Sequence, residues 1–133
     1  MRTAVDSSVL LDVIVNEARF ADRSEAALRS AAAEGALVLG ECVLAEIRPA
    51  FEGDRIAEFL GDWNLEFVPS TRASALLAGE MFGRYLERRR RREPRVVADF
   101  LIGAHAQHSA DRLLARDRGY YRDYFSDLLL VEP

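Results

Sequence analysis

Four acidic residues stand inside or beside apolar segments, where a charge adds little to solubility. They are Asp6, Glu46, Asp99 and Asp117. If the fold brings these carboxylates together, their mutual repulsion requires a cation. Carboxylate oxygens are hard ligands that suit Mg²⁺ or Mn²⁺. The four acids therefore predict a divalent-metal site, and a metal-dependent phosphodiesterase is the first function to test.

Hydrolysis of a phosphodiester by this route needs few groups besides the carboxylates. A divalent ion polarises a phosphoryl oxygen and lowers the pKa of its water, and a second ion can stabilise the leaving oxygen. One or two carboxylates hold Mg²⁺ while several waters remain bound. No histidine or lysine base is required, so His105 and His108 are expected to be packing or surface residues.

Each acid taken alone also has a structural explanation. Asp6 and Asp99 each stand where a helix is expected to begin, and aspartate is a favoured N-cap residue. Asp117 lies in an Arg-Asp-Arg-Gly segment that reads as a turn. Glu46 could lie on a solvated helix face. The functional interpretation therefore rests on the four positions together.

The elements that must position these acids alternate along the chain. Apolar segments of three to five residues predict strands, and segments with a 3.6-residue period predict helices. This alternation predicts an α/β fold, with a mainly parallel central sheet of about five short strands flanked by helices. Ligands gather at the carboxyl ends of such strands. The strands are expected at 3–5, 36–39, 65–68, 113–115 and 128–131, and the helices after Asp6, at 18–33, from 40 to 47, at 55–63, from 73 to about 91 and at 99–109.

Length and composition limit the other classes of protein. The 133 residues are expected to form one domain, residues 1–133. The single Cys42 excludes an intramolecular disulfide and a cysteine-based zinc cluster. No secretory leader pattern and no apolar run of about 20 residues is present. A cytoplasmic protein without membrane association is the expectation.

The basic charge is concentrated in one arginine run. The chain has no lysine, and Arg88, Arg89, Arg90, Arg91 and Arg92 are consecutive. Between residues 84 and 95, seven arginines stand against two glutamates, a local net charge of 7 − 2 = +5. Cations suit the C-terminal end of a helix, but five in a row exceed what that effect needs. An RNA backbone would offset their repulsion, so the run is a candidate RNA-binding segment.

Four segments resemble motifs of one known family. The chain resembles PIN-domain ribonucleases, and more closely the VapC-type toxins of type II toxin–antitoxin systems. The resemblance runs from end to end, with the four motifs in order and at similar spacing. The segments are Asp6-Ser7-Ser8-Val9-Leu10-Leu11-Asp12, Val43-Leu44-Ala45-Glu46, Ala98-Asp99-Phe100-Leu101-Ile102-Gly103-Ala104-His105-Ala106 and Leu113-Leu114-Ala115-Arg116-Asp117-Arg118-Gly119-Tyr120-Tyr121.

The resemblance implies a role for each matched residue. It implies a PIN-like fold in which Asp6, Glu46, Asp99 and Asp117 form an acidic catalytic pocket, with Asp6 and Asp99 as the most direct metal ligands. Ser8 matches a small polar residue that supports the first acid or a metal-bound water. The family often has Thr or Ser where this chain has Ala115, so a hydroxyl near the metal is missing or supplied from elsewhere.

The function so implied is that of a Mg²⁺-dependent endoribonuclease, with Mn²⁺ as a possible replacement, acting as a toxin. A homodimer and a cognate antitoxin that covers the pocket are the implied partners. Phe51, Phe59 and Trp63 are candidates for an apolar groove, although ordinary core packing is the favoured explanation for them. Transfer, ribosomal and messenger RNA all remain open as substrates.

Two other classes stay as alternatives. One is a non-catalytic PIN-fold module that binds RNA. The other is a phospho-acceptor α/β domain, which also places acids at strand ends but needs a lysine near them. Cleavage of RNA separates the first alternative from the nuclease, and phosphorylation at Asp6 would support the second.

Overall fold

The strands form one parallel sheet with the N-terminal strand in the middle. A computed structural model describes residues 1–88, 96–116 and 119–133. Its five strands are β1 (Thr3–Val5), β2 (Leu37–Leu39), β3 (Leu65–Phe67), β4 (Arg112–Leu114) and β5 (Leu129–Val131). They are ordered β3-β2-β1-β4-β5, and all neighbours are parallel. The predicted α/β class and parallel sheet are confirmed.

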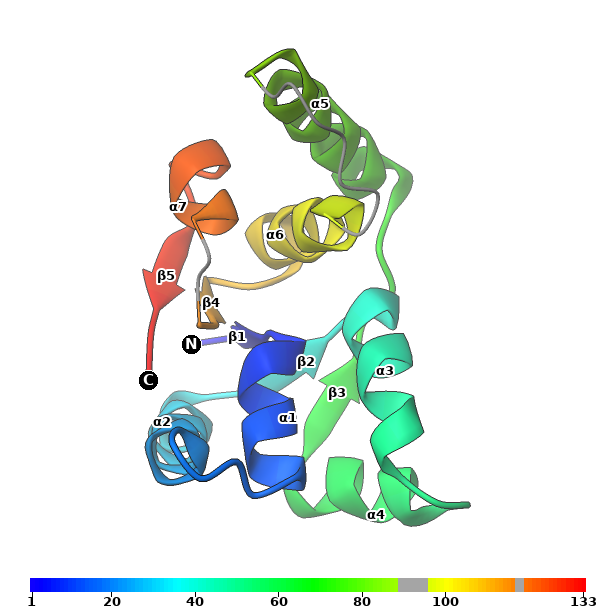
Figure 1. Cartoon of the computed structure of the whole chain (residues 1–133), viewed down its shortest axis with the longest axis vertical. Coiled ribbons are helices and arrows are strands. Elements are labelled where there is room, and N and C mark those ends of the chain that lie inside the picture. The colour runs from blue at the N-terminus through cyan, green and yellow to red at the C-terminus, as the bar shows by residue number, and fades with distance from the viewer. Residues whose placement is uncertain (89–95, 117–118) are drawn as a thin grey trace.

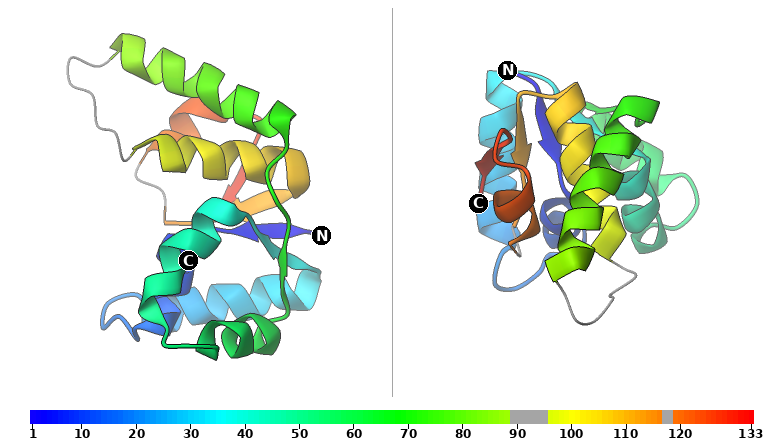
Figure 2. Two further views of the ribbon diagram at one scale, coloured as in Figure 1. Left: turned by 90° about the vertical axis from the view of Figure 1, so that its right-hand side faces the viewer. Right: turned by 90° about the horizontal axis from the view of Figure 1, so that it is seen from above.

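Helices connect the strands and cover both faces of the sheet. Figure 1 shows α5, α6 and α7 on one side of the sheet and α1, α2 and α4 on the other, and Figure 2 shows the same two layers from the side. The helices are α1 (Ser7–Ile14), α2 (Ala21–Glu34), α3 (Glu41–Ile47), the 3₁₀ turn η1 (Arg48–Ala50), α4 (Arg55–Asp62), α5 (Arg72–Arg88), α6 (Val97–Ser109) and α7 (Tyr120–Tyr124).

The central strands are buried on both faces, which explains their largely apolar sequence. Every residue of β1 and β2 is buried, and the core continues into the facing helices through Leu10, Leu28 and Phe100. In the described part of the chain, no helix is long and apolar enough to span a bilayer.

Several element boundaries differ from the sequence prediction. Helix α2 begins at Ala21, three residues late, because the Glu17 carboxylate accepts hydrogen bonds from the backbone N–H groups of Arg19 and Phe20. Strand β4 begins one residue before the predicted 113–115. Leu76 fits the 3.6-residue apolar period of the long helix, yet it is 64% exposed. The predicted end of that helix, at 89–91, lies outside the described residues.

The sequence prediction missed the short helix α7, which packs on α6 through aromatic rings. Tyr120 and Tyr124 have ring centroids 5.9 and 5.2 Å from that of Phe100. A β-carbon on Gly103 would lie 2.7 Å from the Phe125 ring, so only glycine allows this close approach. The contacts fix α7 beside the carboxyl ends of β1 and β4.

Candidate metal-binding active site

Three of the four predicted acids meet in one pocket. Asp6, Glu46 and Asp99 come from the segment after β1, from α3 and from the first turn of α6. They line a pocket of about 360 Å³ together with Ser7, Ser8, Leu11, Arg116, Tyr120 and Tyr121. The expected gathering at the carboxyl edge of the parallel sheet is therefore found for these three.

Asp6 is the most buried of the three and is held by donors on both carboxylate oxygens. It is the N-cap of α1, and its Oδ2 accepts hydrogen bonds from the backbone N–H (3.3 Å) and the hydroxyl (2.5 Å) of Ser8. Its Oδ1 accepts a hydrogen bond from the Tyr121 hydroxyl at 3.1 Å. The capping interpretation is confirmed, and the same side chain also lines the pocket, so capping does not exclude the functional role that stays a prediction.

Glu46 and Asp99 are more open to solvent. Glu46 is exposed, and its Oε1 accepts a hydrogen bond from the Ser7 hydroxyl at 3.1 Å, which ties α3 to α1. Asp99 is half-buried and lies in the first turn of α6, whose N-cap position is Val96. The expectation that Asp99 caps this helix is wrong, because the helix begins at Val97. Its carboxylate still lies near the positive end of the helix dipole.

Tyr121 is a pocket residue to which the sequence prediction gave no role. Burial raises the pKa of its hydroxyl well above the usual value, and the charges of Asp6, Asp99 and Glu46 raise it further. The phenol thus interacts electrostatically with all three described acids, and the raised pKa keeps it protonated as a hydrogen-bond donor. No sequence signal marks it, since its role depends on α7 folding against α6.

Ala115 contributes no hydroxyl to the fourth motif, but the Ser8 hydroxyl contacts the next residue, Arg116. Ala115 is fully buried, and its backbone N–H donates to the Val131 carbonyl oxygen. The Ser8 hydroxyl donates to Asp6 and accepts a hydrogen bond from the Arg116 backbone N–H at 3.2 Å. Ser8 therefore links the first and fourth motifs through hydrogen bonds, and its supporting role at a metal stays a prediction.

Arg116, the residue before the fourth acid, is anchored by a buried carboxylate. Its Nε and Nη2 donate to the two oxygens of Asp12 at 2.9 and 2.8 Å. Ser24 donates a further hydrogen bond to Asp12 at 2.7 Å, and the Arg116 guanidinium lies 4.1 Å from the Phe20 ring centroid. The contacts fix the chain just before residue 117.

Some predicted site residues lie outside the described residues. They are Asp117 in the catalytic set and Arg89 to Arg92 in the arginine run. Arg88 is described and exposed at the end of α5, with its guanidinium 5.6 Å from the Tyr124 ring centroid. This contact places the start of the arginine run next to α7, the helix that carries Tyr121.

The donor set of the pocket fits a hard cation. Within residues 1–88, 96–116 and 119–133, no group of three or more His, Cys, Asp or Glu side chains is positioned to hold a metal ion. Mg²⁺ in proteins is commonly held by only one or two carboxylates and keeps several waters. Asp6 and Asp99 meet that lesser requirement in chemical type, and the pocket has room for waters.

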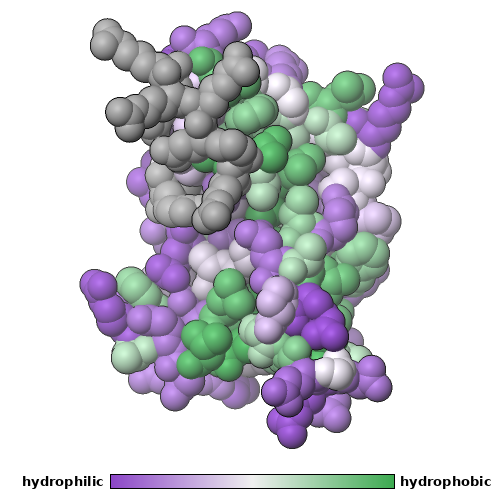
Figure 3. Space-filling model, turned by 45° about the vertical axis from the view of Figure 1, so that its right-hand side comes forward, coloured by the Kyte–Doolittle hydropathy of each residue, from purple (hydrophilic) through white to green (hydrophobic). Residues whose placement is uncertain are grey.

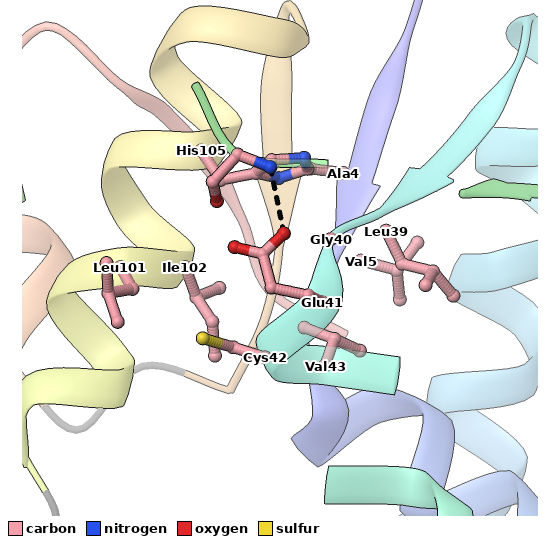
Figure 4. Close-up of a pocket in the computed structure, with 11 residues that line it drawn as sticks. Ala4, Val5, Leu39, Gly40, Glu41, Cys42, Val43, Leu101, Ile102 and His105 are labelled. Carbon is pink, nitrogen blue, oxygen red and sulfur yellow. Dashed lines mark hydrogen bonds between the residues drawn. The ribbon is translucent and has the colours of Figure 1, made fainter. Parts of the chain in front are cut away.

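A second, much smaller pocket is lined by residues of β1, β2, α3 and α6. Figure 4 shows Glu41, Cys42 and His105 around it. Partial burial opposes ionisation of Glu41. Hydrogen bonds from Ser70, a backbone hydrogen bond of Glu41 itself and the charge of His105 together outweigh the burial and lower the pKa of the carboxyl; the dashed line in Figure 4 is the bond from the Ser70 backbone N–H. Burial raises the pKa of the Cys42 thiol. With about 10 Å³ of space, this pocket is too small for a substrate.

Neither histidine belongs to the acidic pocket. His105 is buried, and its Nε2 lies 2.6 Å from the Val68 carbonyl oxygen. His108 is exposed on α6. The prediction that these are packing and surface residues is confirmed.

The three aromatic groove candidates are neither fully buried nor free. Phe51, Phe59 and Trp63 are half-buried and pack on the core, so the groove and the packing interpretations each hold in part. Phe51 and Phe59 line two open pockets of about 590 and 430 Å³ next to Ile14, and Trp63 lines the smaller of the two. Figure 3 shows apolar side chains running from the top to the bottom of one face, interrupted by polar ones.

Comparison with known proteins places this geometry in a family. Residues 3–125 match the model of the PIN domain. The chain belongs to the PIN domain family. A comparison with curated protein sequences gives no significant match.

Solved PIN-like structures share the fold at low sequence identity. VapBC2 from Rickettsia felis, bound to a DNA fragment from its promoter, has a TM-score of 0.73 at 18% identity, covering 99% of this chain and 98% of that one. FitAB bound to the IR36 DNA fragment has a TM-score of 0.70 at 19% sequence identity, and the match covers 98% of this chain and 94% of that one. FitAcB from Neisseria gonorrhoeae has a TM-score of 0.67 at 19% sequence identity, and the match covers 96% of this chain and 95% of that one.

Proposed function

We propose that this PIN chain is a single-domain Mg²⁺-dependent endoribonuclease and the toxin of a toxin–antitoxin pair. The observation that carries the proposal is the pocket in which Asp6, Glu46 and Asp99 converge at the carboxyl edge of the sheet. Three carboxylates facing one space suit a divalent cation and a phosphodiester better than any neutral substrate. Mn²⁺ is the expected replacement for Mg²⁺.

The chain's own residues have distinct roles in this proposal. Asp6 and Asp99 would hold the ion, while Glu46 orients a water or a second ion at the open side of the pocket. Bound Mg²⁺ would supply charge for the phosphoryl oxygen and a more acidic water. Ser8 keeps the Asp6 carboxylate in place by donating to Oδ2. Asp117 is proposed as the fourth acid of the set.

The arginine run is proposed to guide the RNA backbone to the pocket. Arg88, at its start, lies against Tyr124 of α7, and α7 also carries Tyr121 into the pocket. Each phosphate contact releases counterions, so binding should weaken as salt rises. Replacing Arg89, Arg90 and Arg91 with glutamine should flatten the dependence of RNA affinity on salt; an unchanged slope would show that the run is merely solvated.

The proposed partners are a cognate antitoxin and a second copy of this chain. The similar VapBC2 and FitAB structures are complexes, and the two open pockets around Phe51, Phe59 and Trp63 offer an apolar surface to an antitoxin segment. An antitoxin arginine could pair with the pocket carboxylates. Phe59→Ser should weaken antitoxin binding in a titration while leaving RNA cleavage intact, and unchanged affinity would remove this surface from the proposal.

The deciding experiment measures cleavage of total RNA by the purified protein with Mg²⁺, with Mn²⁺ and with excess chelator. Asp6→Asn and Asp99→Asn should each lose activity while keeping the wild-type circular dichroism spectrum. Asp127→Asn, a change of an exposed acid outside the pocket, is the matched control and should cleave normally. Full cleavage by either pocket variant, or in chelator, would refute the mechanism.

The same experiment separates the alternatives. A non-catalytic RNA-binding module would bind RNA but leave it intact under every metal condition. A phospho-acceptor domain would take up label at Asp6 from a phosphodonor, although the chain has no lysine to place beside that acid. The acidic pocket favours neither alternative over the nuclease.

A further inference from the structure

We propose that Tyr121 is a positioning residue whose hydroxyl fixes the orientation of the Asp6 carboxylate for metal binding. The proposal rests on the function proposed above and extends it to a residue outside the four acids. The starting observation is the hydrogen bond of 3.1 Å from the Tyr121 hydroxyl to Asp6 Oδ1, inside the pocket.

Among the described residues, Ser8 and Tyr121 donate hydrogen bonds to Asp6, and each binds a different carboxylate oxygen. Ser8 donates twice to Oδ2, through its backbone N–H and its hydroxyl, and Tyr121 donates to Oδ1. An ionised carboxylate has about four acceptor positions. Because donors of the described residues occupy three of them, the carboxylate cannot rotate freely, and these donors leave one acceptor position for a cation or its water.

The fold holds the Tyr121 hydroxyl in place. Its side chain is only 3% exposed, and α7 begins after Gly119, whose φ of 105° is a left-handed conformation that suits glycine. The rings of Tyr120 and Tyr124 then pack on Phe100 of α6. Because α6 also carries Asp99, one rigid contact sets the position of both proposed metal ligands.

Tyr121 therefore acts through Asp6 and needs no contact with the substrate. Outer-shell partners of metal ligands typically contribute a factor of about 10 to 100 in metal affinity or activity. If the hydroxyl orients a metal ligand, removing it should lower metal affinity even in the absence of RNA. If it serves only packing, removing it should lower the stability of the protein and leave metal affinity unchanged.

The test measures Mn²⁺ binding by calorimetry on the full chain without RNA. Tyr121→Phe keeps the ring and removes the hydroxyl, and it should weaken Mn²⁺ affinity about tenfold or more. Tyr124→Phe makes the same change on the same helix outside the pocket lining, and it should bind Mn²⁺ like the wild type. Urea unfolding of each variant shows that the protein measured is folded.

A double variant separates positioning from packing. In an Asp6→Asn background the tyrosine has no carboxylate to orient, so adding Tyr121→Phe should cause no further loss of Mn²⁺ affinity. Equal affinity of wild type and Tyr121→Phe, or equal losses in both backgrounds, would overturn the inference while leaving the proposed metal site intact. A wild-type protein that does not bind Mn²⁺ would instead overturn the proposed function, and this inference with it.

Discussion

The ion pair between Asp12 and Arg116 should respond very differently to the loss of each partner. The Asp12 side chain is 3% exposed, whereas that of Arg116 is 36% exposed. Removing the arginine leaves an interior carboxylate whose remaining side-chain donor, among the described residues, is the Ser24 hydroxyl. Removing the carboxylate leaves a guanidinium that water can reach. We therefore expect Arg116→Met to destabilise the protein more than Asp12→Asn.

The structure sets the expected magnitudes. Breaking a fully buried pair costs about 3–5 kcal/mol. About a third of the Arg116 side chain is exposed, so solvent screens part of the interaction. The expected loss in the free energy of unfolding for Arg116→Met is therefore about 2–3 kcal/mol. Asp12→Asn keeps an acceptor for Ser24 and should cost about 1 kcal/mol. The difference is large compared with the roughly 5–15 kcal/mol of a typical domain.

Urea unfolding followed by circular dichroism measures both costs. With an m-value of about 2 kcal/mol per molar urea, Arg116→Met should lower the midpoint by about 1 M and Asp12→Asn by about half of that. The double variant Asp12→Leu with Arg116→Met removes both charges and should recover part of the loss. Equal costs for the two single variants, or a larger cost for Asp12→Asn, would show that burial of the carboxylate does not determine the energetics.

Two further outcomes follow from packing and from the tyrosine. Gly103→Ala should lower the free energy of unfolding by about 1–3 kcal/mol, because its β-carbon would meet the Phe125 ring. Gly79→Ala on α5 is the control: its added β-carbon would have no described neighbour within 4 Å, and it should raise the free energy of unfolding by up to about 1 kcal/mol. A stabilised Gly103→Ala would mean that the ring moves aside freely. The raised pKa of Tyr121 means that the unfolded chain loses this proton near pH 10 before the folded one does. The contribution of the Tyr121 hydroxyl to the free energy of unfolding is therefore fully present below about pH 10 and is lost as the pH rises above it. When urea midpoints are measured between about pH 8 and 11, the Tyr121→Phe variant should lack this part of the alkaline decrease. Identical alkaline profiles would contradict the reasoning.

The sheet could be predicted from sequence because its central strands are buried on both faces. Such strands read as short apolar runs, and Gly35 and Pro69 mark the ends of the neighbouring segments. The positions of Asp6 and Asp99 next to these runs were equally legible. What periodicity could not supply was the exact start of each helix, which depended at α2 on local hydrogen bonds to Glu17.

The residues that support the acidic pocket from α7 and α1 could not be predicted from the sequence. Helix α7 has only five residues, too few to show a period, and its position depends on ring contacts with α6. The roles of Tyr121 and Asp12 depend on partners 115 and 104 residues away. Such pairs are set by tertiary packing, for which a single sequence offers no local signal.

The hydrogen-bond partners at the site are far apart in the chain and are therefore synthesised at different times. Tyr121 follows its partner Asp6 by 115 residues. At about 5–20 residues per second, roughly 6 to 23 seconds separate them on the ribosome. For most of that interval β1 lacks its neighbour β4, and throughout it the pocket lacks the wall formed by α7. A nascent chain that has not yet reached α7 would thus carry the first acid of the proposed nuclease without its completed site, and the pocket could assemble only after α7 has been made.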